Sequence, residues 1–509
     1  MTSNIRFSLN YYSFKSVQRK IFNATVLKTE VPTIAANASK SINDVQTVII
    51  GAGLAGLSAA NHLIKNGFKR TIILEATNRY GGRINSKQFG DAFCELGAKY
   101  IAIDVSHNSI YELLRQAPGL PKKIEEKTET LYVDTKGKKI SKHIPEVVDV
   151  YFKRLCAGIE LKNRYKKGNL HELNNVHTYF QAESSKIIKN LFKEKDRRLV
   201  SDIFSAFMKD YGGKLGCNLE NLNVEQLIKF KNQLSYPLYI PSGLDSILQE
   251  VATNIDEENL HTAKPVGEIK WYGPNKDQSK SVNCLDGSVV PADHIICTLP
   301  LGVLKTFSGY MFKPQLPPEK IKSIENIGFG TPVKIYFEYE KQIKPWFTAN
   351  LRPLWSAEER AADLKWTKQV VEISKLPTSS RVLEISIGGA FYDQIEKLPD
   401  KEVVDEITKL LRVCLKNSNI PFPSEVLRSN WSSSACFLGG RPYFSTNSSV
   451  KDIQILAIPL GMSPSLLFAG DATIVNGFGT IDGARMSGIR EAQRIIDYYT
   501  KNNYNNKIQ

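Results

Sequence analysis

Long apolar runs are missing from this chain of 509 residues. No stretch approaches the roughly 18 consecutive apolar residues of a membrane-spanning helix, so the sequence predicts no integral membrane segment. Hydrophobic residues make up 42% and charged residues 23% of the chain, which is ordinary for a globular protein. A chain of this length is expected to bury large cores and to divide into two or more domains.

Paired cysteines and metal-ligand spacings are also missing. The cysteines are odd in number and scattered, with no CxxC and no His/Cys ligand spacing. This pattern favours reduced thiols packed in the core, and we expect no metal site. The cysteines are Cys94, Cys156, Cys217, Cys284, Cys297, Cys414 and Cys436.

Acidic residues are outnumbered: 67 Lys and Arg against 52 Asp and Glu give a formal net charge of +15. The basic residues are dispersed and lack the interleaved aromatics of a nucleic-acid surface, so we expect no nucleic-acid partner. A strongly positive protein also repels a polycation rather than steering it. The charge therefore weighs against a polycationic substrate unless acidic groups lie near the site.

Acids are absent from the N-terminal tail, residues 1–44, before Glu30. Its basic and serine content resembles a mitochondrial presequence, but a disordered basic extension has the same composition. We expect a cytoplasmic protein, with a mitochondrial location as the alternative. The basic residues of the tail are Arg6, Lys15, Arg19, Lys20 and Lys28.

What the chain does contain is a glycine motif, "TVIIGAGLAGLSAANHLIKNGFKRTIILE", which begins at Thr47. The apolar run 48–50 predicts a buried parallel strand, and apolar residues at helical spacing predict a helix that ends near residue 67. A second strand is predicted over 71–74 and ends on Glu75. Strand, glycine turn, helix, strand and acid form the order of a dinucleotide-binding unit.

Each residue type has a physical role in such a unit. Gly51 allows a tight turn, Gly53 lets backbone N–H groups approach a pyrophosphate, and Gly56 lets the helix pack closely on the strand. The positive end of the helix faces the phosphates. Glu75 is expected to accept hydrogen bonds from an adenosine ribose, and its carboxylate disfavours the 2′-phosphate of NADP.

A second motif, "EATNRYGGRI", adds Arg79, a glycine pair and Arg83 directly after the acid, which puts two cations beside the expected pyrophosphate. GxGxxG, an acid and then RxGGR resemble the N-terminal motifs of the flavin-containing amine oxidase family. The following "ELGAKYIAI" resembles that family's next segment. The resemblance implies FAD.

The resemblance continues over most of the chain, and it is strongest to the animal polyamine oxidases, spermine oxidase and acetylpolyamine oxidase. The matching segments are "YIPSGLDSILQEVA", "AKPVGEIKW", "ADHIICTLPLGVLK", "FGTPVKIYFEY" and "LLFAGDATIVNGFGTIDGARMSGIREA". The cofactor-binding residues that the motifs and the resemblance imply are Gly51, Gly53, Ala55, Gly56, Glu75, Arg79, Arg83, Gly97, Tyr100, Val266, Asp471, Thr480 and Ile481.

The order of these motifs implies an α/β fold with two domains. We expect a discontinuous Rossmann-like FAD-binding domain, because its pieces come from both ends of the chain, and a mixed α+β substrate-binding domain between them. Residues 106–235 look mostly helical, whereas "GTPVKIYFEYE" alternates as a strand. The FAD-binding domain is assigned to 45–105, 240–300 and 465–500, and the substrate-binding domain to 106–239 and 301–464.

Lys334 is the candidate catalytic cation. The resemblance places a lysine bonded through water to flavin N5 at this position. On its strand Lys334 lies in sequence among Val333, Ile335 and Phe337, and a cation in apolar surroundings is costly unless it is partnered or its pKa is lowered. The alternative is an ordinary strand lysine that faces solvent.

Tyr443, in "GGRPYFS", is the second catalytic candidate. Related enzymes carry an aromatic residue in front of the flavin in the matching segment. Such a ring favours a developing iminium by cation–π attraction, worth about 0.5–2 kcal/mol. The alternative is a tyrosine of the hydrophobic core.

Departures from the family pattern also carry information. Arg441 and Pro442 replace the cysteine of the GGCY pattern that holds FAD covalently in monoamine oxidases, so we expect non-covalent FAD. Tyr100 and Ala102 stand where the family usually has Trp and a His or acid that contacts a polyamine nitrogen. Asp471 replaces the Glu of the FAGE motif, which keeps the carboxylate but shortens its reach.

The sequence therefore predicts an FAD-dependent amine oxidase, polyamine oxidase-like, that transfers hydride from an amine C–H to flavin N5 and then to O2. The products are an aldehyde, an amine and H2O2. Two alternatives stay open: a flavin oxidase of the same fold for a different amine, and an FAD-binding protein with little turnover.

Overall fold

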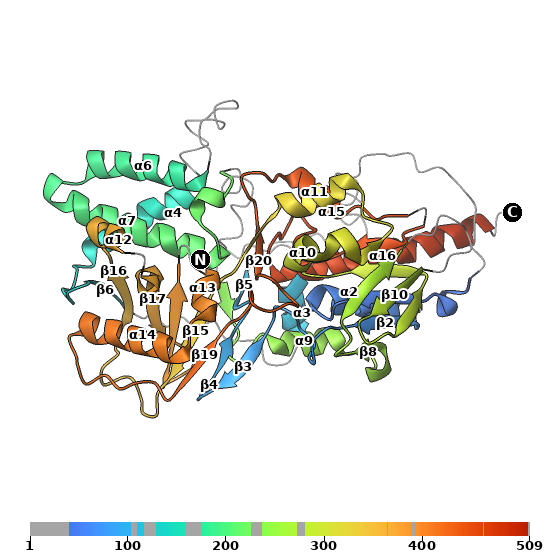
Figure 1. Cartoon of the computed structure of the whole chain (residues 1–509), viewed down its shortest axis with the longest axis horizontal. Coiled ribbons are helices and arrows are strands. Elements are labelled where there is room, and N and C mark those ends of the chain that lie inside the picture. Colours follow the sequence, from blue (N-terminus) through green and yellow to red (C-terminus); the bar gives the residue numbers. More distant parts are fainter. Residues whose placement is uncertain are drawn as a thin grey trace, which may run out of the picture.

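The computed structural model describes residues 40–102, 109–116, 129–158, 175–224, 237–271, 280–363, 365–388, 392–461 and 463–506. Two lobes lie side by side along its long axis (Figure 1). Most of the predicted tail, residues 1–39, lies outside the described ranges. Residues 40–44, which the sequence placed in that tail, carry a short 3-10 helix, η1 (Ile42–Asp44), and Lys40 pairs with Asp293 at 2.6 Å.

The first lobe is built on a five-stranded parallel sheet in the order β21-β12-β1-β2-β8. Val48 in the centre lies opposite Ile295 on one side and Ile72 on the other. Every residue of β1 and of its neighbour β12 is buried, as expected for a parallel sheet covered on both faces. The strands are β1 (Thr47–Ile50), β2 (Thr71–Leu74), β8 (Leu260–His261), β12 (His294–Cys297) and β21 (Leu466–Phe468).

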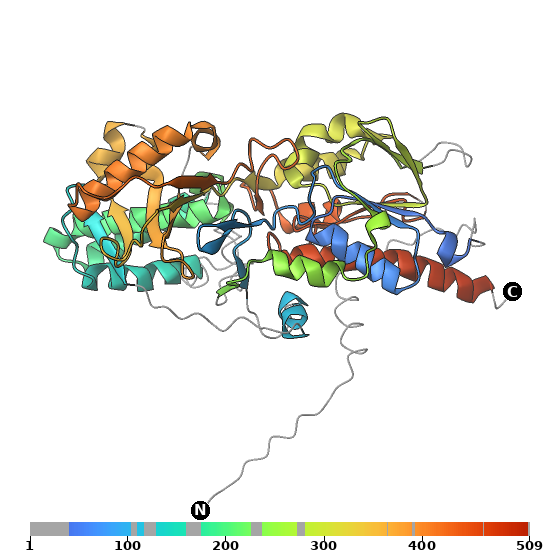
Figure 2. The same ribbon diagram turned by 90° about the horizontal axis from the view of Figure 1, so that it is seen from below.

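Helices cover one face of this sheet. Figure 2 shows α9, α2 and α16 running side by side along it. Leu57 and Leu63 recur at helical spacing on α2 and pack in one core with Ile49 of the sheet and Ile495 of α16. The helices of this face are α2 (Leu54–Lys65), α3 (Ser109–Gln116), α9 (Asp245–Ala252) and α16 (Ile481–Asn506), with η5 (Glu257–Asn259) at its edge.

A second core covers the other face, where Val48 and Ile50 meet Phe312 and Ile324. It is formed by a four-stranded sheet in the order β11-β10-β9-β13 and three helices. These elements are β9 (Val266–Lys270), β10 (Lys280–Cys284), β11 (Val289–Ala292), β13 (Phe312–Lys313), α10 (Leu301–Met311), α11 (Pro318–Asn326) and α15 (Val450–Leu456).

The second lobe holds a six-stranded, mainly antiparallel sheet in the order β19-β15-β18-β17-β16-β6. On one face Ile335 and Phe337 pack with Ile407 and Leu411 of α14. The helices α4, α6 and α7 form a separate core around Phe180 and Phe204. The strands are β6 (Thr130–Asp134), β15 (Lys334–Glu338), β16 (Asn350–Leu354), β17 (Val370–Lys375), β18 (Val382–Ile387) and β19 (Glu425–Arg428). The helices are α4 (His143–Cys156), α6 (Val176–Leu191), α7 (Glu194–Leu215), α12 (Ala357–Ala362), α13 (Tyr392–Lys397) and α14 (Asp400–Leu415), with η3 (Leu219–Asn221) and η6 (Trp366–Gln369).

Three two-stranded pairs join the lobes. Figure 1 places β3, β4, β5 and β20 between them. The pairs are β3 (Ser86–Phe89) with β4 (Ala92–Glu95), β5 (Tyr100–Ala102) with β7 (Pro237–Tyr239), and β14 (Gly328–Gly330) with β20 (Arg441–Tyr443). Segments from distant parts of the sequence therefore meet at this junction.

The α/β class and the strand–helix–strand order at the glycine motif are confirmed, and the predicted strand over 71–74 has these bounds. Six of the cysteines are buried, Cys436 is partly exposed, and all seven are free. No helix in the described ranges is long and apolar enough to cross a membrane. Within the same ranges, no group of three or more His, Cys, Asp or Glu side chains could hold a metal ion.

The close approach of α2 to β1 predicts the effect of one methyl group. A Cβ on Gly56 would lie 2.0 Å from the Gly51 carbonyl oxygen, which is backbone and cannot move cheaply. We expect Gly56→Ala to lower the free energy of unfolding by about 1–3 kcal/mol or more, because overpacking displaces backbone. Denaturant unfolding measures this change.

Gly309 of α10 is the matched control, because it is exposed and nothing lies within 4 Å of its Cβ position. We expect Gly309→Ala to stabilise the protein by roughly 0.5–1 kcal/mol through helix propensity. Equal unfolding midpoints for Gly56→Ala and the unmodified protein would contradict the close approach.

Candidate active site

The glycine turn leaves the N-terminus of α2 open. Gly51 follows β1 directly and has φ +102°, a conformation that favours glycine. Gly53 is the N-cap residue, no side chain caps the helix, and nothing lies within 4 Å of the Cβ position on Gly53. Backbone donors and the positive helix end therefore face open space, which suits a phosphate group. Ala55, in the first turn, meets α16, because a Cβ on Gly488 would lie 2.1 Å from the Ala55 carbonyl oxygen.

Glu75 lies at the carboxyl end of β2, beside the same turn, and is 7% exposed. Its Oε2 accepts a hydrogen bond from the backbone N–H of Ala52 at 2.8 Å. Its Oε1 accepts from the N–H and the hydroxyl of Thr77 at 2.9 and 2.7 Å. Val266 begins β9 nearby, after Lys264, whose N–H donates to the Glu75 carbonyl. The carboxylate is thus fixed at the edge of the glycine turn.

The two arginines of the second motif, which the sequence places beside the expected pyrophosphate, are both bound to protein groups. Arg79 donates to the carbonyls of Tyr80, Gly82 and Ile84, at 2.7 to 3.2 Å, and so holds its own loop. This loop brings Gly82 against Gly53: a Cβ on Gly82 would lie 3.2 Å from the Gly53 Cα. The loop backbone, rather than a free guanidinium, therefore borders the glycine turn.

Arg83 joins this loop to the C-terminal part of the chain. Its guanidinium makes a bidentate ion pair with Asp471, at 2.7 and 2.9 Å, and donates to the Gly440 carbonyl at 3.0 Å. It also lies over the Phe329 ring, 5.5 Å from the centroid. The shorter acid that replaces the FAGE glutamate is therefore the partner of Arg83.

Thr480 and Ile481 lie at the start of α16. The Thr480 side chain accepts from the N–H of Gly483 at 3.1 Å and donates to the Gly477 carbonyl. The N–H of Gly479 donates to the Asp471 carbonyl, so this loop adjoins the Arg83–Asp471 pair. The predicted cofactor residues from both ends of the chain are thus brought together here.

Lys334 begins β15 and points at the segment that follows β4. Its Nζ donates to the carbonyls of Glu95 and Gly97, at 2.9 and 2.6 Å. Burial lowers the pKa of Lys334 to about 8. The amino group is therefore held by two backbone carbonyls rather than extending freely into solvent.

The surroundings predicted for Lys334 from sequence are wrong in one respect. Val333, Ile335 and Phe337 pack in the core against α14, on the opposite face of the strand. Lys334 shares its face with Tyr336, because alternate residues of a strand point to the same side. The amino group lies among carbonyls and charged groups rather than in an apolar pocket.

Charged residues that sequence reasoning missed complete this surrounding. Lys99 and Glu384 form a buried ion pair. Tyr336 donates to the Glu95 carbonyl at 2.9 Å, the same oxygen that accepts from Lys334. Glu384 comes from β18 and Lys99 from the segment before β5, so only the strand pairing brings them to Lys334. The sequence contained one sign of this polar cluster: Lys334 and Tyr336 are two residues apart on a predicted strand and therefore share a face.

Tyr443, the second catalytic candidate, is 9% exposed and packs its ring against Gly328, where a Cβ would lie 2.3 Å from the ring. Burial raises the pKa of Tyr443 to about 12. It also belongs to the helical core around Phe204. The side chain therefore lies at the junction of the lobes, and its packing fits a core residue as well as an aromatic wall.

Arg441 precedes Tyr443 on β20 and donates to the Lys214 carbonyl at 3.2 Å. Its Nε is buried and has no hydrogen-bond partner among the described residues. Burial lowers the pKa of Arg441, and Asp471 raises it in part. A cation thus lies between the loop before α16 and the end of α7.

The remaining candidates lie near β5. Gly97 packs against the Arg83 carbonyl, where a Cβ would lie 1.9 Å from the oxygen. Tyr100 is 48% exposed and contacts Tyr239 edge to face, with ring centroids 6.4 Å apart. Ala102 is paired with Pro237 across β5 and β7.

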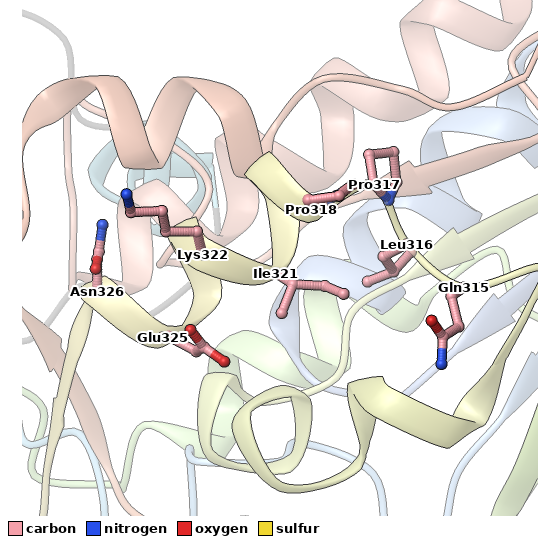
Figure 3. Close-up of a pocket in the computed structure, with 8 residues that line it drawn as sticks. All are labelled: Gln315, Leu316, Pro317, Pro318, Ile321, Lys322, Glu325 and Asn326. Carbon is pink, nitrogen blue, oxygen red and sulfur yellow. The ribbon is translucent and has the colours of Figure 1, made fainter.

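A cavity of about 660 Å³ lies elsewhere, beside α11 (Figure 3). None of the residues predicted for the site lines it. The lining residues are Gln315, Leu316, Pro317, Pro318, Ile321, Lys322, Glu325 and Asn326.

Comparison with known proteins agrees with this arrangement. The family model of flavin containing amine oxidoreductases matches residues 54–496. "Protein anon-37Cs" of Drosophila melanogaster is 51% identical, over 95% of this chain and 97% of its own length. The peroxisomal N(1)-acetyl-spermine/spermidine oxidase of Homo sapiens is 28% identical, over 89% of this chain and 95% of its own.

A solved structure of a putrescine oxidase double mutant, redesigned in its cofactor binding, shares the fold. Its TM-score is 0.66 at 18% sequence identity, and the match covers 89% of this chain and 99% of that chain. The resemblance inferred from the motifs is confirmed. Because the family model matches most of its length, the chain belongs to the flavin containing amine oxidoreductase family, as an FAD-dependent amine oxidase.

Proposed function

We propose that this amine oxidase acts on polyamine-type substrates. A hydride leaves the carbon next to an amine nitrogen, water hydrolyses the resulting imine to an aldehyde and an amine, and O2 takes up the two electrons to give H2O2. The observation that carries the proposal is the buried Lys334 amino group, held by two carbonyls where the lobes meet. The polyamine class is supported by the relative named as an N(1)-acetyl-spermine/spermidine oxidase.

FAD, when bound, supplies the hydride acceptor. The chain offers the groups that fit it: the open N-terminus of α2 at Gly53 for the pyrophosphate, and Glu75 for the ribose. Arg441 occupies the place of a cysteinyl attachment, so the chain holds the cofactor without a covalent bond there.

Lys334 has two tasks in this proposal. The charged amine donates two of its three N–H groups to the Glu95 and Gly97 carbonyls, so the third can orient a water molecule in front of the reacting carbon. The positive charge stabilises negative charge that develops nearby. A pKa of about 8 lets the amine exchange a proton near neutral pH. Tyr443 would flank the substrate amine from β20.

A different amine is the second candidate, and the cations near the junction favour it. Arg441 has a buried Nε without a partner among the described residues, and Lys99 lies 5.1 Å from the Tyr100 ring centroid. Ala102 stands where the resemblance expects a group that binds a polyamine nitrogen. These features suit an amine with fewer positive charges or with an anionic group.

Two acids at α12 of the second lobe are paired with cations rather than free to attract a polyamine. Glu358 pairs with Arg198, and Asp363 pairs with Lys368. Their charges are therefore partly neutralised, which leaves the choice between the two candidates to experiment.

Anaerobic mixing with a panel of amines tests the function, because loss of flavin colour reports hydride transfer without O2. We expect spermine, spermidine or their acetylated forms to bleach the flavin. Bleaching only by monoamines or by amines that carry a carboxylate would establish the second candidate. A flavin that no amine bleaches would refute both.

Glu75→Gln tests the cofactor assignment. The amide keeps the shape but weakens a charge-assisted hydrogen bond to ribose, worth about 1.5–3 kcal/mol. We expect FAD affinity, measured by titration of the apoprotein, to fall on the order of tenfold or more. The control is Thr77→Val, which removes a donor to the same carboxylate but keeps its charge. An equal loss in both variants would mean that Glu75 acts only by holding the turn.

Lys334→Met tests the mechanism. We expect FAD to stay bound, while flavin reduction by amine or reoxidation by O2 slows by about 10²–10³, the usual cost of losing a group that stabilises developing charge. Stopped-flow absorbance separates the two half-reactions. Lys320→Met is the control, since Lys320 is a buried lysine that donates to three carbonyls near the end of α15. Wild-type rates in Lys334→Met would refute the assignment.

A further inference from the structure

Lys334 is one end of a continuous chain of polar groups. Lys334 Nζ and Tyr336 Oη both donate to the Glu95 carbonyl, each at 2.9 Å. Tyr336 Oη also lies 3.4 Å from Glu384 Oε1, and the other carboxylate oxygen of Glu384 pairs with Lys99. This series of polar groups therefore runs from Lys334 through the Glu95 carbonyl, the Tyr336 hydroxyl and the Glu384 carboxylate to Lys99.

Strand register builds this chain. Lys334 and Tyr336 point to the same face of β15, and Tyr336 lies directly opposite Glu384 on the antiparallel strand β18. Lys99 approaches from the segment between β4 and β5. A shift of one residue between β15 and β18 would turn Glu384 to the other face and leave Lys99 without its acid.

Burial makes the charges in this chain sensitive to one another. Burial lowers the pKa of Lys99, but Glu384 and Tyr100 together more than offset this and raise the pKa above its usual value. Burial raises the pKa of Glu384, but Lys99 and Lys334 together hold it below its ordinary value. Burial has the largest effect on Lys334 and lowers its pKa. The charge of Glu384 raises that pKa in part, and the charge of Lys99 lowers it further.

The other titratable groups that face Lys334 come from β4. Burial raises the pKa of the Glu95 carboxyl, which accepts from the Ser86 hydroxyl and the Leu244 N–H. Burial also raises the pKa of the Cys94 thiol, which leaves it uncharged at neutral pH. Around Lys334, Glu384 and Glu95 favour the protonated amine and Lys99 opposes it, so the Lys99–Glu384 pair contributes charges of both signs.

We propose that the Lys99–Glu384 pair is a positioning device for Lys334, which fixes its place through Tyr336 and the Glu95 carbonyl and acts on the charge of its amino group. The inference rests on the proposed function in placing Lys334 beside the flavin. Neither member of the pair touches the reacting atoms in this role. Each acts through Lys334.

This role differs from a purely structural one in the sign of its effects. Removing Glu384 takes away a charge that favours protonated Lys334, so Lys334 should titrate at lower pH. Removing Lys99 takes away a charge that opposes protonation, so Lys334 should titrate at higher pH. Loss of packing alone gives no reason for opposite shifts.

The experiment uses the holoenzyme and needs no substrate. The visible absorbance of the oxidised, bound flavin is titrated with pH, since a charge near the ring shifts its spectrum. We expect a transition in the wild type that Lys334→Met abolishes, that Glu384→Gln moves to lower pH and that Lys99→Met moves to higher pH. Each shift should be on the order of one pH unit, as for charges a few ångströms apart.

A control and a double variant keep the test decisive. Tyr336→Phe changes no charge and should move the transition less than either single variant. If a single variant fails to fold because it buries an unpaired charge, Lys99→Met combined with Glu384→Gln removes both charges and should still move the transition to lower pH, because Glu384 is the stronger influence. Shifts in the same direction for both single variants, or a double variant whose transition moves to higher pH, would overturn the proposal.

Failure of this inference is separable from failure of the proposed function. A wild type that bleaches with amines but shows no transition assigned to Lys334 refutes the inference alone. A transition that responds to the variants as expected supports it whichever amine is the substrate.

Discussion

The ion pair between Arg83 and Asp471 holds the site together. These residues are separated by 388 positions. Arg83 belongs to the N-terminal glycine loop after β2, and Asp471 belongs to the loop that follows β21 near the C-terminus. The same guanidinium binds the Gly440 carbonyl, next to β20, and lies over the ring of Phe329 in β14. One side chain thus fixes the N-terminal glycine loop, the C-terminal loop and the strand pair between the lobes.

Burying charges at such a junction is expensive unless each charge is paired. Removing a partner from a buried ion pair typically costs 3–5 kcal/mol, because the remaining charge stays in a medium of low dielectric constant. The buried charges here are partnered in this way. Lys99 pairs with Glu384, and Lys334 donates to the Glu95 and Gly97 carbonyls. The arrangement keeps an amine buried, fixed and able to titrate near pH 8, which a lysine in solvent or in an apolar pocket would not do.

In the proposed function, the same junction also limits the substrate. A polycation must bring its charges close to Lys99, Lys334 and Arg441, in a protein of net charge +15. Most acids near these cations are already paired, as Asp471 is with Arg83 and Glu384 with Lys99. In that proposal, a polyamine is recognised by carbonyls and aromatic rings, whereas an amine with an anionic group gains directly from the cations.

The sequence by itself determined the cofactor-binding unit. Gly51 and Gly56 are required by local backbone geometry, and the acid after the second strand follows at a fixed distance along the chain. Spacing alone therefore predicted β1, α2, β2 and the position of Glu75. It also singled out Lys334, through a motif carried on one strand.

Tertiary structure alone decided what surrounds these residues. The partners of Arg79, Arg83 and Lys334 are carbonyls and carboxylates from distant segments, and the Lys99–Glu384 pair exists only because β15 and β18 pair in one register. Long-range register depends on how whole faces of a sheet are buried, and no local spacing records it.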